Sequence, residues 1–296
     1  GLNMALDSMQ EILDKSQAWG KSFWEVVLET DMQEREVSRE ASLERMRHTW
    51  RSMVETSDGY ASDRRSRSGL VGGDGGRMRE YMEEHEPIGG NFLGQVIAEA
   101  LATGESNACM RRIVAAPTAG ACGVMPAVLI PLYRSGKVSE DEVVKALYVA
   151  SGIGAVVAYK ACIAGASGGC QAEIGTASAM AAGALVQLRG GNEEQICHAV
   201  AMALKNLLGL VCDPVAGLVE VPCVKRNVVG AANAICAADM ALAGITSRIP
   251  VDQVIDAMGD VGRRLPIEFR ETALGGLAVT PFGQKVKEQL KNAPEE

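Results

Sequence analysis

Aromatic residues and histidines are scarce in this chain of 296 residues. Phe, Trp and Tyr together make up 4 % of the sequence. Apolar and polar residues alternate only over short stretches, so signals for β-strands are almost absent. The three histidines, His48, His85 and His198, are too scattered for the HExxH pattern of a zinc site. The sequence therefore argues against a β-rich fold and against that class of zinc enzyme.

Basic residues are outnumbered, and long apolar runs are missing. The chain has 29 Lys and Arg residues against 37 Asp and Glu residues, a net charge of −8, whereas nucleic-acid binding depends on basic patches. No apolar run reaches the roughly 18 residues that span a bilayer, and no signal peptide opens the sequence. We therefore expect a cytoplasmic protein that binds neither nucleic acid nor a membrane.

Eight cysteines are present, but no two of them form a CxxC pair. This absence excludes zinc ribbons, thioredoxin-like motifs and ferredoxin-type cluster runs. In a reducing compartment such cysteines are core residues, metal ligands or reactive thiols. The glycine-rich stretch 68–76 lacks the Gly-Lys-Ser/Thr of a P-loop. Two interpretations of that stretch stay open, a flexible connector and a loop that covers a substrate.

Charged and small residues are unevenly distributed. About a third of residues 1–100 are charged, against about a tenth of residues 146–245, which are rich in Ala and Gly. Apolar residues at helical spacing, ended by Gly or Pro, predict helices over 91–103, 123–133, 140–164, 176–188, 193–208, 229–244 and 251–258. We predict a mainly α fold, a compact multi-helix bundle with buried Ala- and Gly-rich central helices.

The same patterns divide the chain into three regions. Residues 1–64 are predicted to form a helical cover over the body, with Ser8 and Glu11 as a capping box; a partner-docking arm is the alternative. Residues 65–285 form the central domain, which carries the candidate site at turns that flank helices. Residues 286–296 are charged and are predicted to be a frayed tail.

The cysteines fall into two groups by their neighbours. Four lie in Ala-rich helical segments, where a free cysteine behaves as a small hydrophobic residue: Cys109, Cys162, Cys197 and Cys236. Cys170, Cys212 and Cys223 lie instead beside Gly or Pro, which end regular structure and can direct a sulfur toward a metal centre. Cys122 shares that context. The spacing of the three matches no local metal motif, so core packing and a three-thiolate metal site both stay open. An iron–sulfur cluster held by three cysteines would leave one iron free as a Lewis acid.

Polar residues gather around these cysteines in an otherwise apolar region. Ser167, Gln171 and Glu173 flank Cys170, Asp213 and Glu220 flank the other two, and Lys225, Arg226 and Asn227 follow. A structural ion pair between Glu220 and Arg226 is one interpretation, because buried charges are usually paired. Thr118 is either a helix cap or a catalytic hydroxyl. Lys160 lies mid-helix and too near the 165–169 glycine stretch for a pyridoxal phosphate site.

Three runs of this sequence resemble the alpha chain of bacterial iron–sulfur-dependent L-serine dehydratase. They are Ala-Pro-Thr-Ala-Gly at 116–120, Gly-Ala-Ser-Gly-Gly-Cys-Gln-Ala-Glu at 165–173, and the run from Leu208 to Asn227 that contains Cys-Asp-Pro-Val-Ala-Gly and Val-Pro-Cys-Val-Lys-Arg-Asn. The loop 68–74 and residues 270–278 are also similar. The resemblance covers about residues 65–285, and the N-terminal helices match loosely.

The resemblance implies a [4Fe–4S] cluster whose thiolates are Cys170, Cys212 and Cys223, with Cys122 outside the ligand set. It implies a carbon–oxygen lyase that converts L-serine to pyruvate and ammonia, a step of amino-acid catabolism and gluconeogenesis. It also implies a separate beta chain with a regulatory domain, and hence a hetero-oligomer. In one-chain members a C-terminal cysteine can occupy the open iron; this sequence ends Asn-Ala-Pro-Glu-Glu, which argues against that device here.

Roles for the polar residues follow from the same resemblance. The serine hydroxyl would bind the open iron while a base removes the α-proton. Thr118 and Ser167 are the candidate catalytic hydroxyls. Lys225 or Arg226 would bind the substrate carboxylate or offset the cluster's negative charge, with Ser68 and Asn227 as further substrate-binding candidates; the base is left open. The alternatives are a related lyase such as cysteine desulfidase, and a non-catalytic subunit that only carries the cluster.

Overall fold

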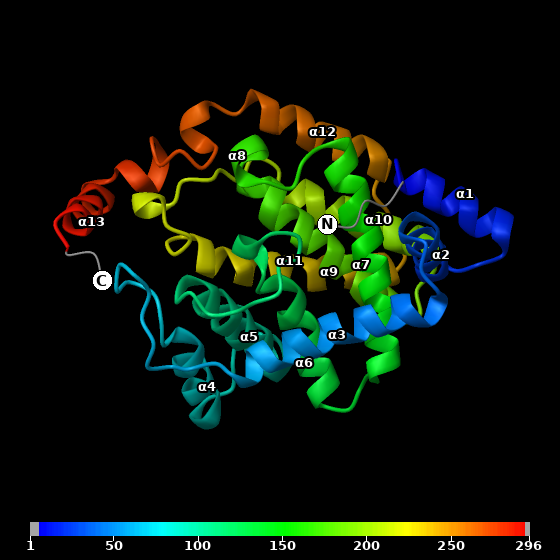
Figure 1. The fold of residues 1–296 in the computed structure, drawn as a ribbon, viewed down its shortest axis with the longest axis horizontal. Coiled ribbons are helices and arrows are strands. Elements are labelled where there is room, and N and C mark those ends of the chain that lie inside the picture. The colour runs from blue at the N-terminus through cyan, green and yellow to red at the C-terminus, as the bar shows by residue number, and fades with distance from the viewer. Residues whose placement is uncertain (1–5, 294–296) are drawn as a thin grey trace.

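The computed structural model describes residues 6–293, and in that part of the chain the regular structure is entirely helical. Thirteen α-helices are joined by short loops and 3₁₀ turns, and the described residues contain no β-strand, only an isolated bridge between Cys212 and Arg270. The prediction of a mainly α fold is therefore confirmed (Figure 1). The helices are α1 (Met9–Trp19), α2 (Phe23–Arg35), α3 (Arg39–Asp58), α4 (Asp74–Glu84), α5 (Gly90–Ala108), α6 (Val124–Arg134), α7 (Glu140–Lys160), α8 (Gly165–Gly168), α9 (Cys170–Leu188), α10 (Glu193–Asn206), α11 (Cys223–Leu242), α12 (Val251–Arg264) and α13 (Pro281–Lys291).

Helix α9 lies at the centre of the bundle and packs against α6, α7, α10 and α11. Small residues make this close packing possible, since a Cβ added at Gly183 would collide with Ile153 of α7. Likewise, a Cβ at Gly230 of α11 would come within 3.0 Å of Ile174 Cγ2. The predicted Ala- and Gly-rich central helices are thus the ones that approach one another most closely.

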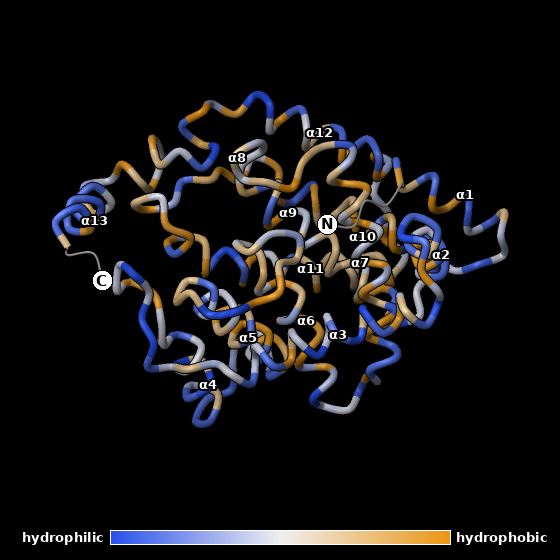
Figure 2. The backbone as a smooth tube through the Cα atoms, viewed as in Figure 1, coloured by the Kyte–Doolittle hydropathy of each residue, from blue (hydrophilic) through white to orange (hydrophobic). Residues whose placement is uncertain are grey.

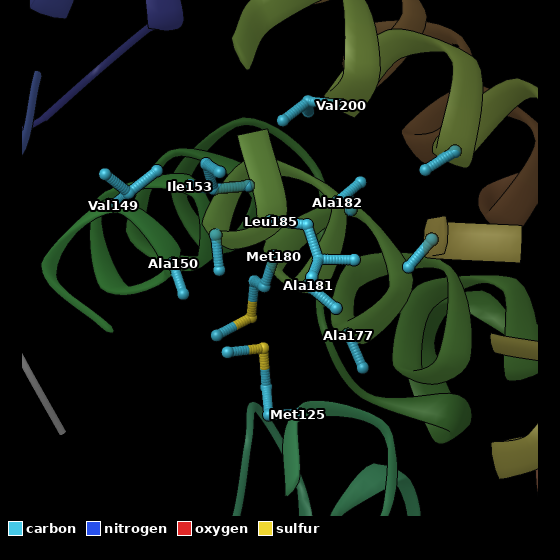
Figure 3. Close-up of a cluster of buried hydrophobic side chains, with 14 of the residues drawn as sticks. Met125, Val149, Ala150, Ile153, Ala177, Met180, Ala181, Ala182, Leu185 and Val200 are labelled. Atoms are coloured by element: carbon cyan, nitrogen blue, oxygen red, sulfur yellow. The ribbon is translucent and has the colours of Figure 1, made fainter. Parts of the chain in front are cut away.

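The apolar core fills the space between these helices, and one part of it is shown in Figure 3. The side chains of Val149 and Ile153 on α7 and of Leu185 on α9 are among those packed there. Met125 of α6 and Met180 of α9 extend their thioethers toward each other at the edge of this cluster. Full burial of each such side chain contributes about 1.5–3 kcal/mol to folding.

The described residues of the 1–64 region form α1, α2 and α3. Helices α2 and α3 pack against α7, and α1 packs against α2, α10 and α12 (Figure 1). Ser8 caps α1 by accepting a hydrogen bond from the Glu11 amide, but Glu11 accepts one from the Asp7 amide and not from the Ser8 amide, so only half of the predicted capping box forms. Phe23 and Val27 of α2 are fully buried against the core. These helices therefore share the main hydrophobic core with the rest of the bundle.

Several helix boundaries differ from the sequence expectation, and three of them bear on the site. Helix α7 ends at Lys160, before the predicted 164, while α9 begins at Cys170 and α11 at Cys223, each six residues before its predicted start. Gly169, with φ of +75°, and Pro222 are the residues at which the chain turns into α9 and α11. The consequence is that two of the three singled-out cysteines are the first residues of long, central helices.

Helix α7 is the one described helix that is long and apolar enough, by length and composition, to cross a membrane. Of its apolar window, 67 % is buried inside the protein against α2, α3 and α9, as in the core helix of a globular bundle. The C-terminal part, from α12 through the 3₁₀ turns Ile267–Phe269 and Gly276–Val279 to α13, lies along the outside (Figures 1 and 2). Of the predicted frayed tail, residues 286–291 belong to α13, and 294–296 lie outside the described residues.

Candidate active site

Cys170, Cys212 and Cys223 line one small enclosed cavity of about 20 Å³. They reach it from three separate places: the first turn of α9, the loop before the 3₁₀ turn Val215–Gly217, and the first turn of α11. The other lining residues include Gly120, Glu173, Val219, Arg226 and Glu271. All three thiols are free, so the cavity brings together three sulfurs, two carboxyl groups and one guanidinium.

The electrostatics of these thiols favour the presence of a cationic centre. The pKa of each of the three is raised to about 12, mainly by burial and also by the neighbouring thiols and Glu173, while the charge of Arg226 acts in the opposite direction. Helices α9 and α11 begin at Cys170 and Cys223, so the positive ends of two long helix dipoles lie at the sulfurs and favour thiolates. A thiolate here therefore needs further positive charge, which a coordinated metal supplies.

The three cavity thiols could in principle bind one metal ion or a metal cluster. Among the described residues, no three Cys, His, Asp or Glu side chains are placed as the ligands of one metal ion. The thiolates of an iron–sulfur cluster bind different irons and so lie further apart than the ligands of a single ion. Three thiols that line one cavity, with Arg226 beside them, are the kind of donor set that an iron–sulfur cluster requires.

Arg226 connects α11 to the loop that carries Cys212. Its Nη1 donates to the Val211 carbonyl at 2.8 Å and forms an ion pair with Asp213 Oδ1 at 3.0 Å. Asp213 Oδ2 in turn accepts a hydrogen bond from the Leu277 amide at 2.8 Å. The expected partner of Arg226, Glu220, is bonded elsewhere, so the Glu220–Arg226 interpretation is wrong.

Glu220 is buried and holds the glycine-rich stretch instead. Its Oε1 accepts hydrogen bonds from the hydroxyls of Ser66 and Ser68, the latter at 2.5 Å. Gly72, with φ of +136°, has no room for a side chain because a Cβ would collide with the Arg64 carbonyl. The second part of the stretch, from Asp74, already belongs to α4. The Ser68 hydroxyl is thus engaged in fixing this loop beside Cys223.

Thr118 and Glu173 meet at the cavity. Thr118 Oγ1 donates a hydrogen bond of 2.9 Å to Glu173 Oε1. Burial raises the pKa of Glu173, the Thr118 hydrogen bond lowers it, and the nearby Glu271 raises it, with a net increase above the usual value. Space beside Glu173 is kept open by Gly165, where a Cβ would lie 2.9 Å from Glu173 Oε2 and 3.2 Å from Cys212 Sγ.

Glu173 and Glu271 were not among the candidate site residues, although both line the cavity. A signal for Glu173 was available, since it follows Cys170 by three residues and so lies on the same face of a helix. Glu271 carried no such spacing signal, although it lies in the 270–278 segment that resembles the family. It reaches the cavity because its amide donates to the Cys212 carbonyl, a pairing between segments 59 residues apart.

The remaining candidates are placed differently. Ser167 is exposed on α8 and Lys225 is exposed on α11, and neither lines the cavity. Asn227 is buried, with its amide group bonded to the backbone of Gly120, Gly123 and Cys223. These bonds hold the 3₁₀ turn Ala119–Ala121 and the start of α6 against α11.

The other cysteines lie away from the site. Cys122 is buried with its Sγ 3.8 Å from the Thr103 carbonyl, and it does not line the cavity. Of the four cysteines expected in the core, Cys197 is buried, Cys109 and Cys162 are half-buried, and Cys236 is exposed. The expectation of core packing is therefore wrong for Cys236, which falls on the outward face of α11.

A family model described as "Serine dehydratase alpha chain" matches residues 18–278. The chain is 46 % identical over 266 residues to the "Probable L-serine dehydratase, alpha chain" of Bacillus subtilis (strain 168), covering 90 % of this chain and 89 % of that protein. It is 40 % identical over 287 residues to the "L-serine dehydratase, alpha chain" of Peptoniphilus asaccharolyticus, covering 95 % and 97 %.

A relative from Escherichia coli (strain K12), "L-serine dehydratase 1", is 44 % identical over 191 residues, which are 64 % of this chain and 42 % of that protein. The match to the family spans the cysteines, Thr118, Glu173 and Arg226, and extends over most of the N-terminal helices as well. The chain belongs to the serine dehydratase alpha chain family.

Proposed function

We propose that this chain is the alpha subunit of an L-serine dehydratase, which converts L-serine to pyruvate and ammonia by eliminating water. The observation that supports this most is the meeting of three thiols, Glu173 and Arg226 at one cavity, in a chain whose relatives carry that activity in their names. A lyase of this kind needs a group that assists departure of hydroxide and a base for the α-proton.

We infer that Cys170, Cys212 and Cys223 would hold a [4Fe–4S] cluster. When bound, the cluster would supply an open iron as a Lewis acid that makes the serine hydroxyl a better leaving group. Arg226 would offset its negative charge, because the guanidinium lines the cavity while its Nη1 bonds fix the Cys212 loop. This role accounts for Arg226 better than binding of the substrate carboxylate does.

We assign removal of the α-proton to Glu173. Its Oε1 is held by Thr118, so Oε2, beside the space that Gly165 leaves open, is the oxygen free to take a proton. Burial makes the carboxylate a stronger base than an exposed one, because its charged form is less well solvated. Loss of water then yields an enamine, whose imine form hydrolyses to pyruvate and ammonia.

We further infer that the enzyme includes a beta chain and works in the cytoplasm. The relatives' names describe alpha chains, and the match covers only 42 % of the longer Escherichia coli protein. A second chain would supply the part of the enzyme that the longer Escherichia coli protein carries outside the matched region.

Anaerobic purification of the chain, alone and with its partner, tests the proposal. We expect about four iron and four sulfide per chain, a visible spectrum that L-serine changes, and pyruvate formation. Cys170→Ala, Cys212→Ala and Cys223→Ala should each lose iron and turnover, whereas Cys236→Ala, the exposed control, should keep both.

Three results would contradict parts of this proposal. Full iron content in one of the three cysteine variants would remove that residue from the ligand set. A higher kcat/KM for L-cysteine, with sulfide release, would make the chain a desulfidase. A cluster-loaded chain that stays inactive in every combination would leave it a non-catalytic subunit.

A further inference from the structure

A cleft of about 490 Å³ lies between α3 and α7, apart from the cysteine cavity. We call it the α3–α7 cleft and define it by Arg45, Met46 and Met53 of α3 and by Ala150, Ser151 and Gly154 of α7. Its floor includes Met125 and Met180, the two thioethers that point toward each other in Figure 3. The N-terminal helices and the catalytic body thus enclose it together.

The body of the cleft is apolar and its size is that of a ligand site. Ligand pockets occupy about 300–1,000 Å³, are mostly apolar, and carry a few polar groups that orient the ligand. Methionine and alanine side chains, with Val114, Leu147 and Ile163, supply most of the apolar lining here. Arg45 is exposed and Thr49 half-buried on the α3 side, and Ala158 is exposed on the α7 side, so the cleft is open to solvent between these helices.

The polar end of the cleft carries one uncommitted positive charge. Asp31 and Arg35 form an ion pair at 2.6 Å, and Ser42 lies 2.6 Å from both Asp31 and the Tyr148 hydroxyl. These four side chains are hydrogen-bonded or ion-paired to one another. Arg47 and Arg51 on the same helix have carboxylate partners, whereas Arg45 forms no ion pair with any residue of the described chain. The charge of Arg45 lowers the pKa of Asp31 without an ion-pair contact in the described chain, so the cleft presents a guanidinium with no carboxylate bonded to it beside an apolar body.

Two segments connect this cleft to the cysteine cavity. Ala116 and Pro117 line the cleft, and the next residue is Thr118, which holds Glu173. On the other side Ile163 lines the cleft two residues before Gly165, whose Cα lies beside Glu173 and Cys212. A molecule in the cleft would contact both segments at once.

We propose that the α3–α7 cleft binds a small carboxylate with a hydrocarbon body, its carboxylate on Arg45 and its body against Met125 and Met180. Occupation of the cleft fixes the 114–118 segment and so alters how Thr118 holds Glu173; this second part rests on the proposed function. The binding site itself does not, because it is defined by groups outside the cysteine cavity.

Calorimetric titration of the full chain with 3-phenylpropionate, and with the neutral 3-phenylpropanamide as the matched probe, tests the site. We expect saturable binding of the acid and at least tenfold weaker binding of the amide, because the charged hydrogen bond to Arg45 is lost. Arg45→Gln should remove this preference, and Ser151→Phe, which fills the cleft from α7, should abolish binding of both probes. Arg51→Gln, on the same helix but outside the cleft, should bind like the parent protein.

The coupling is tested by L-serine turnover with and without the acid. We expect the acid to change kcat or KM at least twofold in the parent protein and in Arg51→Gln, but not in Arg45→Gln. Absence of binding overturns the proposed site, also where the reason is that a partner chain covers the cleft. Equal binding of acid and amide overturns it as well. Binding without any change in turnover overturns the coupling. If the chain has no dehydratase activity, the titration still decides the site.

Discussion

Thr118 Oγ1 donates a 2.9 Å hydrogen bond to Glu173 Oε1, joining a loop and a helix that are 55 residues apart in the sequence. The loop precedes α6 and the helix is α9, whose first residue is Cys170. This bond orients one carboxylate oxygen and leaves the other toward Gly165 and Cys212. The pair thus sets the direction in which Glu173 can accept a proton.

Glu173→Gln should remove the base and keep the shape of the side chain. We expect kcat to fall by about 10²–10⁴-fold, the usual contribution of a positioned general base, while iron content stays at the parent level. Thr118→Val should lower kcat less, and Thr118→Ser should restore most of it because the hydroxyl returns. Glu194→Gln, an exposed control on α10, should leave turnover unchanged. Parent-like turnover in Glu173→Gln would assign the proton transfer to another group.

Gly165→Ala tests the space between Glu173 and Cys212. The added methyl would lie 2.9 Å from Glu173 Oε2 and 3.2 Å from Cys212 Sγ, so one of the two groups must move. We expect loss of iron or a drop of at least tenfold in kcat, with helix content unchanged by circular dichroism. Gly175→Ala on α9 is the matched control, because its Cβ would meet only Met258 and Leu204 at 3.8–3.9 Å. It should raise stability by about 0.5–1 kcal/mol through helix propensity.

Asp213→Asn tests how the Cys212 loop is held. The substitution removes the charge that pairs with Arg226, although the amide oxygen can still accept from the Leu277 amide. We expect unfolding free energy to fall by about 1–3 kcal/mol, with weaker retention of iron on exposure to a chelator. Denaturant unfolding and iron release rates measure the two effects. Unchanged iron retention would show that the ion pair is not needed, and that the remaining hydrogen bonds of the loop to Arg226, Leu277 and residues 269–271 hold it.

The sequence allowed the helical class and the group of three cysteines to be predicted, but not the connections between them. Gly and Pro beside Cys170, Cys212 and Cys223 are local signals, and the structure places these three thiols on one cavity. The partner of Arg226 was mispredicted because Glu220 and Asp213 are both near it in sequence. Which carboxylate reaches it depends on the path of the loop from 208 to 222.

The starts of α9 and α11 were also misplaced, and for a related reason. Periodicity detects a helix where its apolar face begins, whereas these helices begin earlier, at Cys170 and Cys223, in turns with small or polar residues. Glu271 reaches the cavity through pairing between distant segments, which no local pattern records. Tertiary contacts therefore decided those parts of the site that spacing could not.

Asp31→Asn tests the polar end of the α3–α7 cleft through stability at different pH values. Burial would raise the pKa of Asp31, but hydrogen bonds from Arg35 and Ser42 and the charge of Arg35 hold it below its ordinary value of 3.8. A lowered folded-state pKa contributes stability above the unfolded pKa, and this is lost as pH falls through the folded value.

We expect Asp31→Asn to lower the unfolding free energy by about 1–3 kcal/mol at pH 7. Urea unfolding should show this difference shrinking below pH 3.8, while Asp14→Asn, an exposed control on α1, should differ little from the parent at any pH. A gap between Asp31→Asn and the parent that stays constant into acid would mean that the carboxylate contributes through packing and not through its charge.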